Sequence, residues 1–222
     1  NVTVTNNKGS IVSSFTVQPQ QTASLTFPKE KRTEKYLVTA TTSSGTSMAV
    51  SFTKAKGWGL LLGGATVPPC SVVTWAYDDS RAPNKTTTFE KDLRESLNIL
   101  STETGLTFVE INDYKKAQLR YRWAPISVAG TGSTDGTITL STKSFWAKDG
   151  YAGFKPFKAN KNYTSGPSGR GWLIIHETMH SLGYDHVKDP KSIMAPINTG
   201  QGKFTKADLD GLHSVYRSHC GV

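Results

Sequence analysis

The chain has 222 residues, enough for one large domain or for a medium domain with a small one. Hydrophobic residues make up 36% and charged residues 19%, proportions typical of a globular protein in water. No stretch approaches the roughly 18 consecutive apolar residues of a membrane-spanning helix, so we expect no membrane span.

The net charge is +9, and much of the excess lies in the first third of the chain. Residues 1–66 contain seven Lys or Arg against two Asp or Glu. Such a bias can attract an anionic surface or polymer, although a basic face that only aids solubility is the simpler interpretation. The sequence has no arginine-rich helix, zinc finger or basic–aromatic ribonucleoprotein motif, so we expect no nucleic-acid partner.

Five short runs of alternating hydrophobicity occupy the first 56 residues and predict β-strands. They cover residues 2–5, 13–18, 23–27, 35–42 and 47–54, with turn-forming residues between them. This spacing is typical of a small antiparallel sandwich or barrel, so we expect an all-β domain over residues 1–56. Residues 57–69 follow as a glycine-rich linker, part of which can pack against either neighbour.

From residue 70 onward the pattern changes to mixed α and β. Strands are predicted at 71–78, 106–111, 117–124 and 136–142, the last one preceded by a glycine-rich turn at 129–136. A capping box at 87–90 predicts the start of a helix that ends near Gly105. A long loop from 147 to 171 leads to a helix at 172–182, and a last helix begins at 205–208.

The only cysteines are Cys70 and Cys220, at the two ends of this second part. A lone, widely separated pair predicts one disulfide that ties the C-terminal residues to the body of the domain. The alternative is two free thiols. A disulfide favours an oxidising compartment.

Residues 176–186 read HETMHSLGYDH and contain three of the chain's five histidines. On a helix, positions i and i+4 share a face, so His176 and His180 can bind one tetrahedral zinc ion. Gly183 can adopt a positive φ, which lets the chain turn and bring His186 back as a third ligand. Three protein ligands leave a position for water, as in catalytic zinc sites. The alternative is a buried helix that happens to carry two histidines.

Glu177 adjoins the first of these histidines and is the candidate catalytic residue. Its carboxylate can reach a metal-activated water without binding the metal itself. It would then take the proton of that water as general base and deliver it to the leaving amine.

The stretch matches H-E-x-x-H-x-x-G-x-x-H, the signature of the metzincin metallopeptidases. The following SIMAP resembles the methionine turn of this group, with Met194 eight residues after His186 and Pro196 two residues later, as in the matrixins, the matrix-metalloprotease group. The closing FTKADLDGLHSVY resembles the matrixin C-terminal helix. Over residues 70–222 the resemblance implies an α+β metzincin domain, with a mixed, mostly parallel twisted sheet, three helices and zinc in a central cleft. The small all-β, sandwich-like domain would precede it.

The resemblance also implies how substrate binds. Met194 would form an apolar floor beneath the imidazoles without binding the metal. In the family an edge strand above the helix aligns the peptide, and 136–142 is the candidate, with Thr137, Ile138, Thr139 and Leu140. The segment after the turn would wall the first primed pocket, through Pro196, Ile197 and Asn198.

Several positions depart from the matrixin pattern. Val187 replaces the usual Ser or Thr after the third ligand, and Asn198 stands where many matrixins have the tyrosine of the pocket wall. The histidines that bind a structural zinc in vertebrate matrixins have no counterpart between residues 70 and 171, so we expect a single zinc ion. A microbial relative fits these departures better than a vertebrate matrix protease does. Calcium is an option that no specific motif supports, in turns that contain Asp78, Asp79 and Asp135.

The surroundings of Cys70, VPPCSVV, are faintly similar to the proline-flanked cysteine that blocks the zinc of latent matrixins. In that family the cysteine lies well upstream of the first catalytic strand, whereas Cys70 adjoins it. Pairing with Cys220 is therefore the preferred interpretation.

These features together predict a secreted, monomeric zinc endopeptidase that hydrolyses protein or peptide substrates. Its basic β-domain would be available to contact an anionic surface. One alternative is a binding or adhesion protein on a retained protease scaffold, and another is a zinc hydrolase of a cell-wall amide. Glu177 argues against the first alternative, because a scaffold without catalytic duty needs no carboxylate beside its metal.

Overall fold

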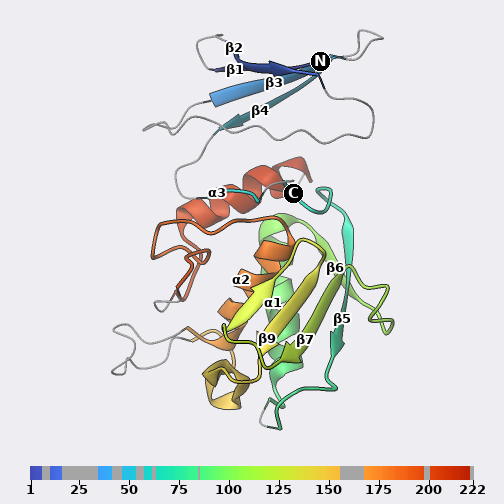
Figure 1. Ribbon diagram of the computed structural model, residues 1–222, viewed down its shortest axis with the longest axis vertical. Coiled ribbons are helices and arrows are strands. Elements are labelled where there is room, and N and C mark those ends of the chain that lie inside the picture. The colour runs from blue at the N-terminus through green and yellow to red at the C-terminus, as the bar shows by residue number, and fades with distance from the viewer. Residues whose placement is uncertain are drawn as a thin grey trace. The chain divides into compact units, whose positions relative to one another are not determined.

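A computed structural model describes residues 1–6, 11–16, 35–41, 47–53, 58–61, 64–84, 86–155, 168–197 and 201–220 of the chain. The chain divides into two compact units, Asn1–Lys56 and Gly57–Val222 (Figure 1). In the described ranges no helix is long and apolar enough to cross a membrane.

The described strands of the first unit form an antiparallel sheet in the order β2-β1-β3-β4. The strands are β1 (Val2–Asn6), β2 (Ile11–Phe15), β3 (Lys35–Thr41) and β4 (Ser47–Thr53). Their many valines and threonines favour a pleated strand, because branched side chains pack well on its surface. The strand expected at 23–27 lies outside the described residues. The described residues of the first unit form this one sheet, so the sandwich stays a prediction.

The second unit contains a five-stranded sheet in the order β6-β5-β7-β9-β8. Its strands are β5 (Val72–Asp78), β6 (Thr107–Glu110), β7 (Leu119–Ala124), β8 (Gly130–Gly132) and β9 (Thr137–Ser141). β6, β5, β7 and β9 run parallel, and β8 is antiparallel to β9. The mixed, mostly parallel sheet is confirmed. β8 falls within the stretch that was predicted to be only a turn.

Three α-helices accompany this sheet in the described part of the second unit: α1 (Phe89–Thr104), α2 (Arg170–Ser181) and α3 (Lys206–Val215). Short 3₁₀ turns occupy residues 145–147, 149–151 and 217–219. α1 and α2 pack side by side behind the sheet in Figure 1. Phe89 of α1 contacts Trp123 of β7, with ring centroids 5.0 Å apart. The hydroxyl of Tyr121 in β7 is 2.9 Å from that of Thr178 in α2. α2 is therefore fixed against the sheet.

The start of α1 differs from the predicted capping box. Thr88 is the N-cap, but its side chain makes no cap hydrogen bond. The hydroxyls of Thr87 and Thr88 instead each donate to the Asp149 carboxylate at 2.7 Å. The end of α1 agrees with the prediction, since Gly105 caps it at φ 73°.

A fully buried ion pair fixes the first residue of α2. The side chain of Arg170 has no exposed area, and its Nε donates to Asp92 of α1 at 2.7 Å. The same guanidinium also donates to Thr88 at 2.8 Å and to the carbonyl of Trp146 at 3.2 Å. A buried charge without these partners would destabilise the fold by several kcal/mol. Moving the start of one helix away from the other would remove partners from Arg170, so the network holds the two helix starts together.

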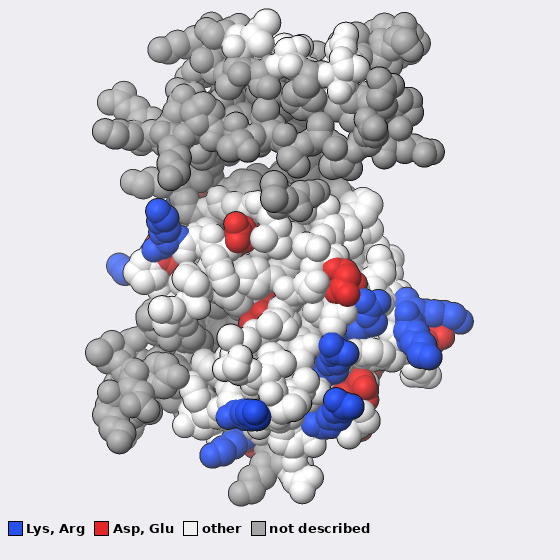
Figure 2. Space-filling view, in the orientation of Figure 1, with Lys and Arg blue, Asp and Glu red and all other residues white. Residues whose placement is uncertain are grey.

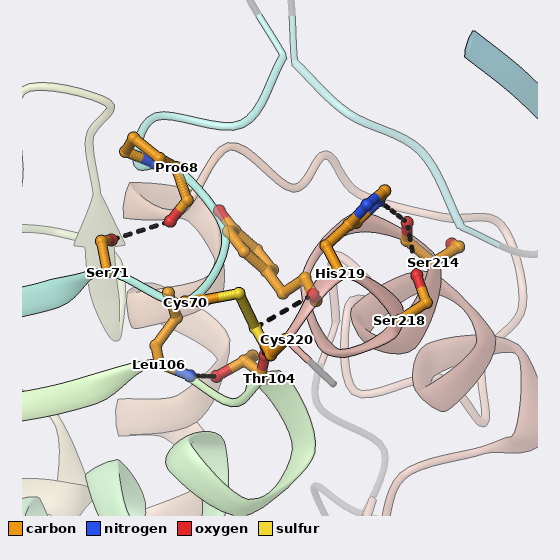
Figure 3. Close-up of a disulfide and its surroundings, with 10 residues drawn as sticks. Pro68, Cys70, Ser71, Thr104, Leu106, Ser214, Ser218, His219 and Cys220 are labelled. Atoms are coloured by element: carbon orange, nitrogen blue, oxygen red, sulfur yellow. Dashed lines mark hydrogen bonds between the residues drawn. A yellow bond between two sulfur atoms is a disulfide. The ribbon is translucent and has the colours of Figure 1, made fainter. Parts of the chain in front are cut away.

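Cys70 and Cys220 form the predicted disulfide, with their Cα atoms 5.2 Å apart (Figure 3). The bond joins the residues just before β5 to the chain after α3, across 150 positions of sequence. Because Cys70 is engaged in this bond, it does not act as a free thiol at the histidines. The latent-matrixin alternative for Cys70 is therefore excluded.

The segment expected to be a linker belongs in part to the second unit. Leu60 forms an antiparallel β-bridge with Tyr184, and the ring of Trp58 lies 6.4 Å from the ring of Tyr184. Packing against a neighbouring domain was one of the options that its sequence left open.

Replacing both cysteines by serine is expected to lower the free energy of unfolding of the second unit by about 2–5 kcal/mol. The reason is that the crosslink restricts the unfolded chain over a long loop. Guanidinium unfolding of the oxidised wild type, the reduced wild type and the double variant would measure the effect. The reduced wild type should behave like the variant, and equal midpoints for the variant and the oxidised wild type would contradict the expectation.

Candidate metal centre and substrate cleft

The structure brings the three histidines of the motif together. His176 and His180 lie one turn apart on α2, and the helix ends at Ser181. Gly183 adopts φ 101°, and the chain turns back so that His186 faces the helix. The three Nε2 atoms lie 3.1–3.2 Å from one another. This convergence follows from the spacing of the motif and from the glycine turn.

Main-chain carbonyls hold two of the rings from behind. Nδ1 of His176 lies 2.6 Å from the carbonyl oxygen of Ile193, and Nδ1 of His180 lies 2.8 Å from that of Tyr184. A carbonyl oxygen only accepts, so each Nδ1 carries the proton and each Nε2 presents a lone pair. Two of the three converging atoms are thereby fixed as acceptors.

The surroundings keep these rings neutral. Burial lowers the pKa of His176 to about 4, and it also lowers the pKa of His180. Neutral imidazole is the form that binds metals. In a tetrahedral zinc site with Zn–N distances of about 2.0–2.1 Å, ligand nitrogens lie about 3.3 Å apart. The geometry and the protonation of this donor set therefore both fit zinc.

Glu177 lies beside the three histidines and is only 5% exposed. Burial raises the pKa of its carboxyl to about 8, and a hydrogen bond from the backbone N–H of Gly132 acts in the opposite direction. A divalent cation at the histidines would lower this pKa, because a nearby positive charge favours the carboxylate. The position and basicity of Glu177 suit a general base.

The methionine turn connects two parts of the histidine cluster. Met194 is buried, and its carbonyl accepts from the backbone N–H of Val187 at 3.0 Å. The preceding residue, Ile193, supplies the carbonyl that holds His176. The turn therefore supports the cluster through its backbone. Pro196 and the exposed Ile197 follow it and line the cleft, whereas Asn198 lies outside the described residues.

Asp208 supports this turn, a role that the sequence did not reveal. Its carboxylate accepts from the backbone N–H of Ile193 at 3.1 Å and from the hydroxyl of Ser192. It also closes the capping box of α3 with Thr205, whose N–H donates to it at 2.7 Å. The T-x-x-D spacing of residues 205–208 is a sequence signal for this cap. The second role of Asp208, in holding the methionine turn, depends on tertiary contacts.

A cleft of about 660 Å³ contains the site. Its walls come from α2, from residues 128–132 in and before β8, and from the segments around the third histidine and after the methionine turn. No Lys or Arg is among its described lining residues, which carry Glu177 and Asp185 as their acids. On the face shown in Figure 2, Lys and Arg lie mostly toward the β5–β6 side and the lower end of the second unit, with Asp and Glu among them. Most of the residues that line the cleft are apolar, so the cleft itself is mainly apolar.

The predicted peptide-aligning strand needs correction. β9 contains Thr137, Ile138, Thr139 and Leu140, and it is flanked by β7 on one side and β8 on the other. The last three of these residues are buried, and none of the four lines the cleft. The sheet ends in β6 on one side and in β8 on the other, and β8 is the edge strand whose residues line the cleft.

β8 was missed because its glycines resemble a turn. A Cβ on Gly132 would lie 1.9 Å from the carbonyl oxygen of Glu177, and one on Gly130 would lie 2.8 Å from its Oε1. Only glycine allows the strand to approach α2 this closely.

The acidic turns do not form a comparable cluster. Among the described residues, the three histidines are the one group of three or more His, Cys, Asp or Glu that could hold an ion together. Asp78 accepts from the backbone of Ser80 at 3.0 Å, and Asp135 accepts from that of Thr137 at 2.8 Å. These hydrogen bonds are local and belong to separate turns.

Asp208→Ala is expected to lower the free energy of unfolding by about 2–4 kcal/mol, because it leaves buried backbone and hydroxyl donors without an acceptor. Asp210→Ala is the matched control, since Asp210 pairs only with exposed Lys206 at 2.7 Å. Chemical denaturation of both variants would measure the difference. Equal stability of the two variants would contradict the role assigned to Asp208.

Comparison with known proteins agrees with this geometry. The matrixin family model matches residues 69–217. Human matrix metalloproteinase-16 is 26% identical in an alignment of 142 positions that covers 57% of this chain and 23% of that protein. Karilysin from Tannerella forsythia is 25% identical in an alignment of 120 positions that covers 52% of this chain and 25% of that protein. Macrophage metalloelastase from Oryctolagus cuniculus is 26% identical in an alignment of 133 positions that covers 57% of this chain and 28% of that protein. The chain thus spans about a quarter of the length of these relatives. The match over residues 69–217 shows that it belongs to the matrixin family.

Proposed function

We propose that this chain is a zinc-dependent endopeptidase that hydrolyses internal peptide bonds of protein substrates. The proposal rests on one observation: three imidazole nitrogens converge beside one buried carboxylate in a cleft. Membership of a metallopeptidase family supports it.

His176, His180 and His186 would hold the zinc ion. Bound zinc acts as a Lewis acid, polarising the scissile carbonyl and making water a better nucleophile near neutral pH. The carbonyls of Ile193 and Tyr184 keep two of the rings in the tautomer that this requires.

Glu177 would act as general base and then as general acid. Its carboxylate takes a proton from the attacking water and delivers it to the leaving amine, as the spacing of the motif predicts. A carboxylate buried beside three histidines favours catalysis over a retained, inactive binding scaffold.

β8 would align the substrate. It ends the sheet order, so its outer edge has no strand partner in the part of the chain that the structure describes. An extended peptide can add to such an edge through main-chain hydrogen bonds. Val128 before the strand and Ile197 on the segment after the methionine turn are exposed apolar lining residues, which suits contact with apolar substrate side chains.

An extracellular location fits the remaining features. The Cys70–Cys220 disulfide is stable in an oxidising compartment. The basic first unit would then contact an anionic surface or polymer near the substrate.

Zinc binding can be tested after removal of metal with a chelator. On reconstitution the wild type is expected to bind one zinc ion per chain, as measured by plasma mass spectrometry, and His180→Ala is expected to lose it. His213→Ala is the matched control, because His213 pairs with Glu103 at 2.8 Å and does not line the cleft. Wild-type zinc content in His180→Ala would refute the assigned ligand set.

The catalytic role can be tested with Glu177→Gln. We expect kcat/KM to fall about 10²–10⁴-fold while zinc content stays at the wild-type level, because the variant loses the base but no ligand. Cleavage of a diverse peptide library, monitored by mass spectrometry, would measure the activity of the wild type and of the variant. If the zinc-loaded wild type cleaved no peptide, the endopeptidase proposal would fail, and a binding protein or an amide hydrolase would be the better assignment.

A further inference from the structure

A short segment before the matrixin match packs against the turn that carries the third histidine. This strap comprises residues 58–61 and 64–66, whereas the family match begins at residue 69. The N–H of Leu61 donates to the carbonyl of Gly183 at 2.7 Å, and the N–H of Asp185 donates to the carbonyl of Gly59 at 2.9 Å. The strap and the turn are therefore paired like two short antiparallel strands.

The other end of the strap is held equally closely. The hydroxyl of Thr66 donates to the carbonyl of Ser181 at 2.6 Å, and its N–H donates to that of Leu182 at 3.3 Å. A Cβ on Gly183 would lie 2.2 Å from the carbonyl oxygen of Gly64. The glycine of the zinc-binding motif thus provides both the positive φ of the turn and the space for the strap.

Trp58 anchors the beginning of the strap. A Cβ on Gly211 of α3 would lie 2.8 Å from the Trp58 ring, so the indole rests directly on the helix backbone. With both ends fixed, the position of the strap beside the turn is well defined.

The two adjacent leucines of the strap contact different parts of the second unit. Leu60 packs against the hydrophobic core, and Leu61 lines the cleft together with Asp185 and His186. In an extended segment, neighbouring side chains point to opposite sides. The β-bridge at Leu60 and the hydrogen bond at Leu61 fix this alternation, so the side chain of Leu61 is held on the side of the cleft.

We propose that Leu61 is a specificity-determining residue and that it forms one wall of a substrate subsite beside the third histidine. The subsite takes an apolar side chain, because Leu61 is apolar and the described lining residues include no Lys or Arg. The neighbouring Asp185 carboxylate is engaged by the backbone N–H of His186 at 2.7 Å. This inference rests on the proposed endopeptidase function. It assigns a substrate contact to residues that lie outside the family match.

The test compares wild type, Leu61→Ala and Leu61→Glu on one diverse peptide library, with cleavage sites identified by mass spectrometry. Removing methylenes from a pocket changes discrimination by about 10-fold or more, so Leu61→Ala should lose about that much preference for bulky apolar residues at one substrate position. Leu61→Glu should shift the same position toward Lys and Arg. Preferences at other positions should stay unchanged.

Leu60→Ala is the matched control, since it truncates the neighbouring leucine on the core side. It should lower the unfolding midpoint and leave the cleavage preference as in the wild type. Zinc content and the unfolding midpoint of each variant identify any variant that fails to fold. Leu61→Val then supplies a conservative replacement, which should weaken the same preference less than Leu61→Ala does.

Unchanged preferences in folded, zinc-loaded and active Leu61 variants would overturn the assignment of Leu61 while leaving the endopeptidase proposal intact. Absence of cleavage by the zinc-loaded wild type would overturn the endopeptidase proposal, and the Leu61 assignment with it. The two failures are therefore distinguishable in one experiment.

Discussion

Three imidazole nitrogens that lie 3.1–3.2 Å apart constrain everything around them. Such a cluster is tolerable only if the rings are neutral and present lone pairs to a common point, since protonated rings would repel one another. Burial supplies the neutrality, as the lowered pKa of His176 shows. The carbonyls of Ile193 and Tyr184 supply the orientation. The fold therefore has to hold two carbonyl oxygens in place.

Distant parts of the chain perform that task. Asp208 at the start of α3 binds the backbone N–H of Ile193, so the C-terminal helix holds the first carbonyl. Leu60 bridges to Tyr184, so residues before the family match hold the segment that carries the second. The disulfide brings these two regions into one body, because it ties the chain after α3 to the chain before β5 (Figure 3). Support for the histidines thus comes from both ends of the second unit.

The local features of this architecture were predictable from the sequence, and the features that depend on tertiary contacts were not. The histidine spacing and the Gly105 cap were predictable because they depend on short-range backbone geometry. The disulfide was predictable because each cysteine has only one other cysteine as a possible partner. The helix begins where it was predicted, but its capping box was predicted wrongly, because the Asp149 carboxylate, about sixty residues away in sequence, accepts from both threonine hydroxyls. The edge strand was placed on β9 rather than β8, because the glycines that allow β8 to approach α2 also resemble a turn.

The same approach of β8 determines the chemistry available to Glu177. The strand covers the carboxylate, and this burial raises its pKa to about 8, so without a metal the group is largely protonated at neutral pH. A cation held by the histidines would reverse this, because its charge would stabilise the carboxylate form. In the proposed mechanism the carboxyl group would therefore act as a base only with the metal bound. The glycines of β8, which let the strand lie close to α2, would in this way link the proposed general base to the proposed metal site.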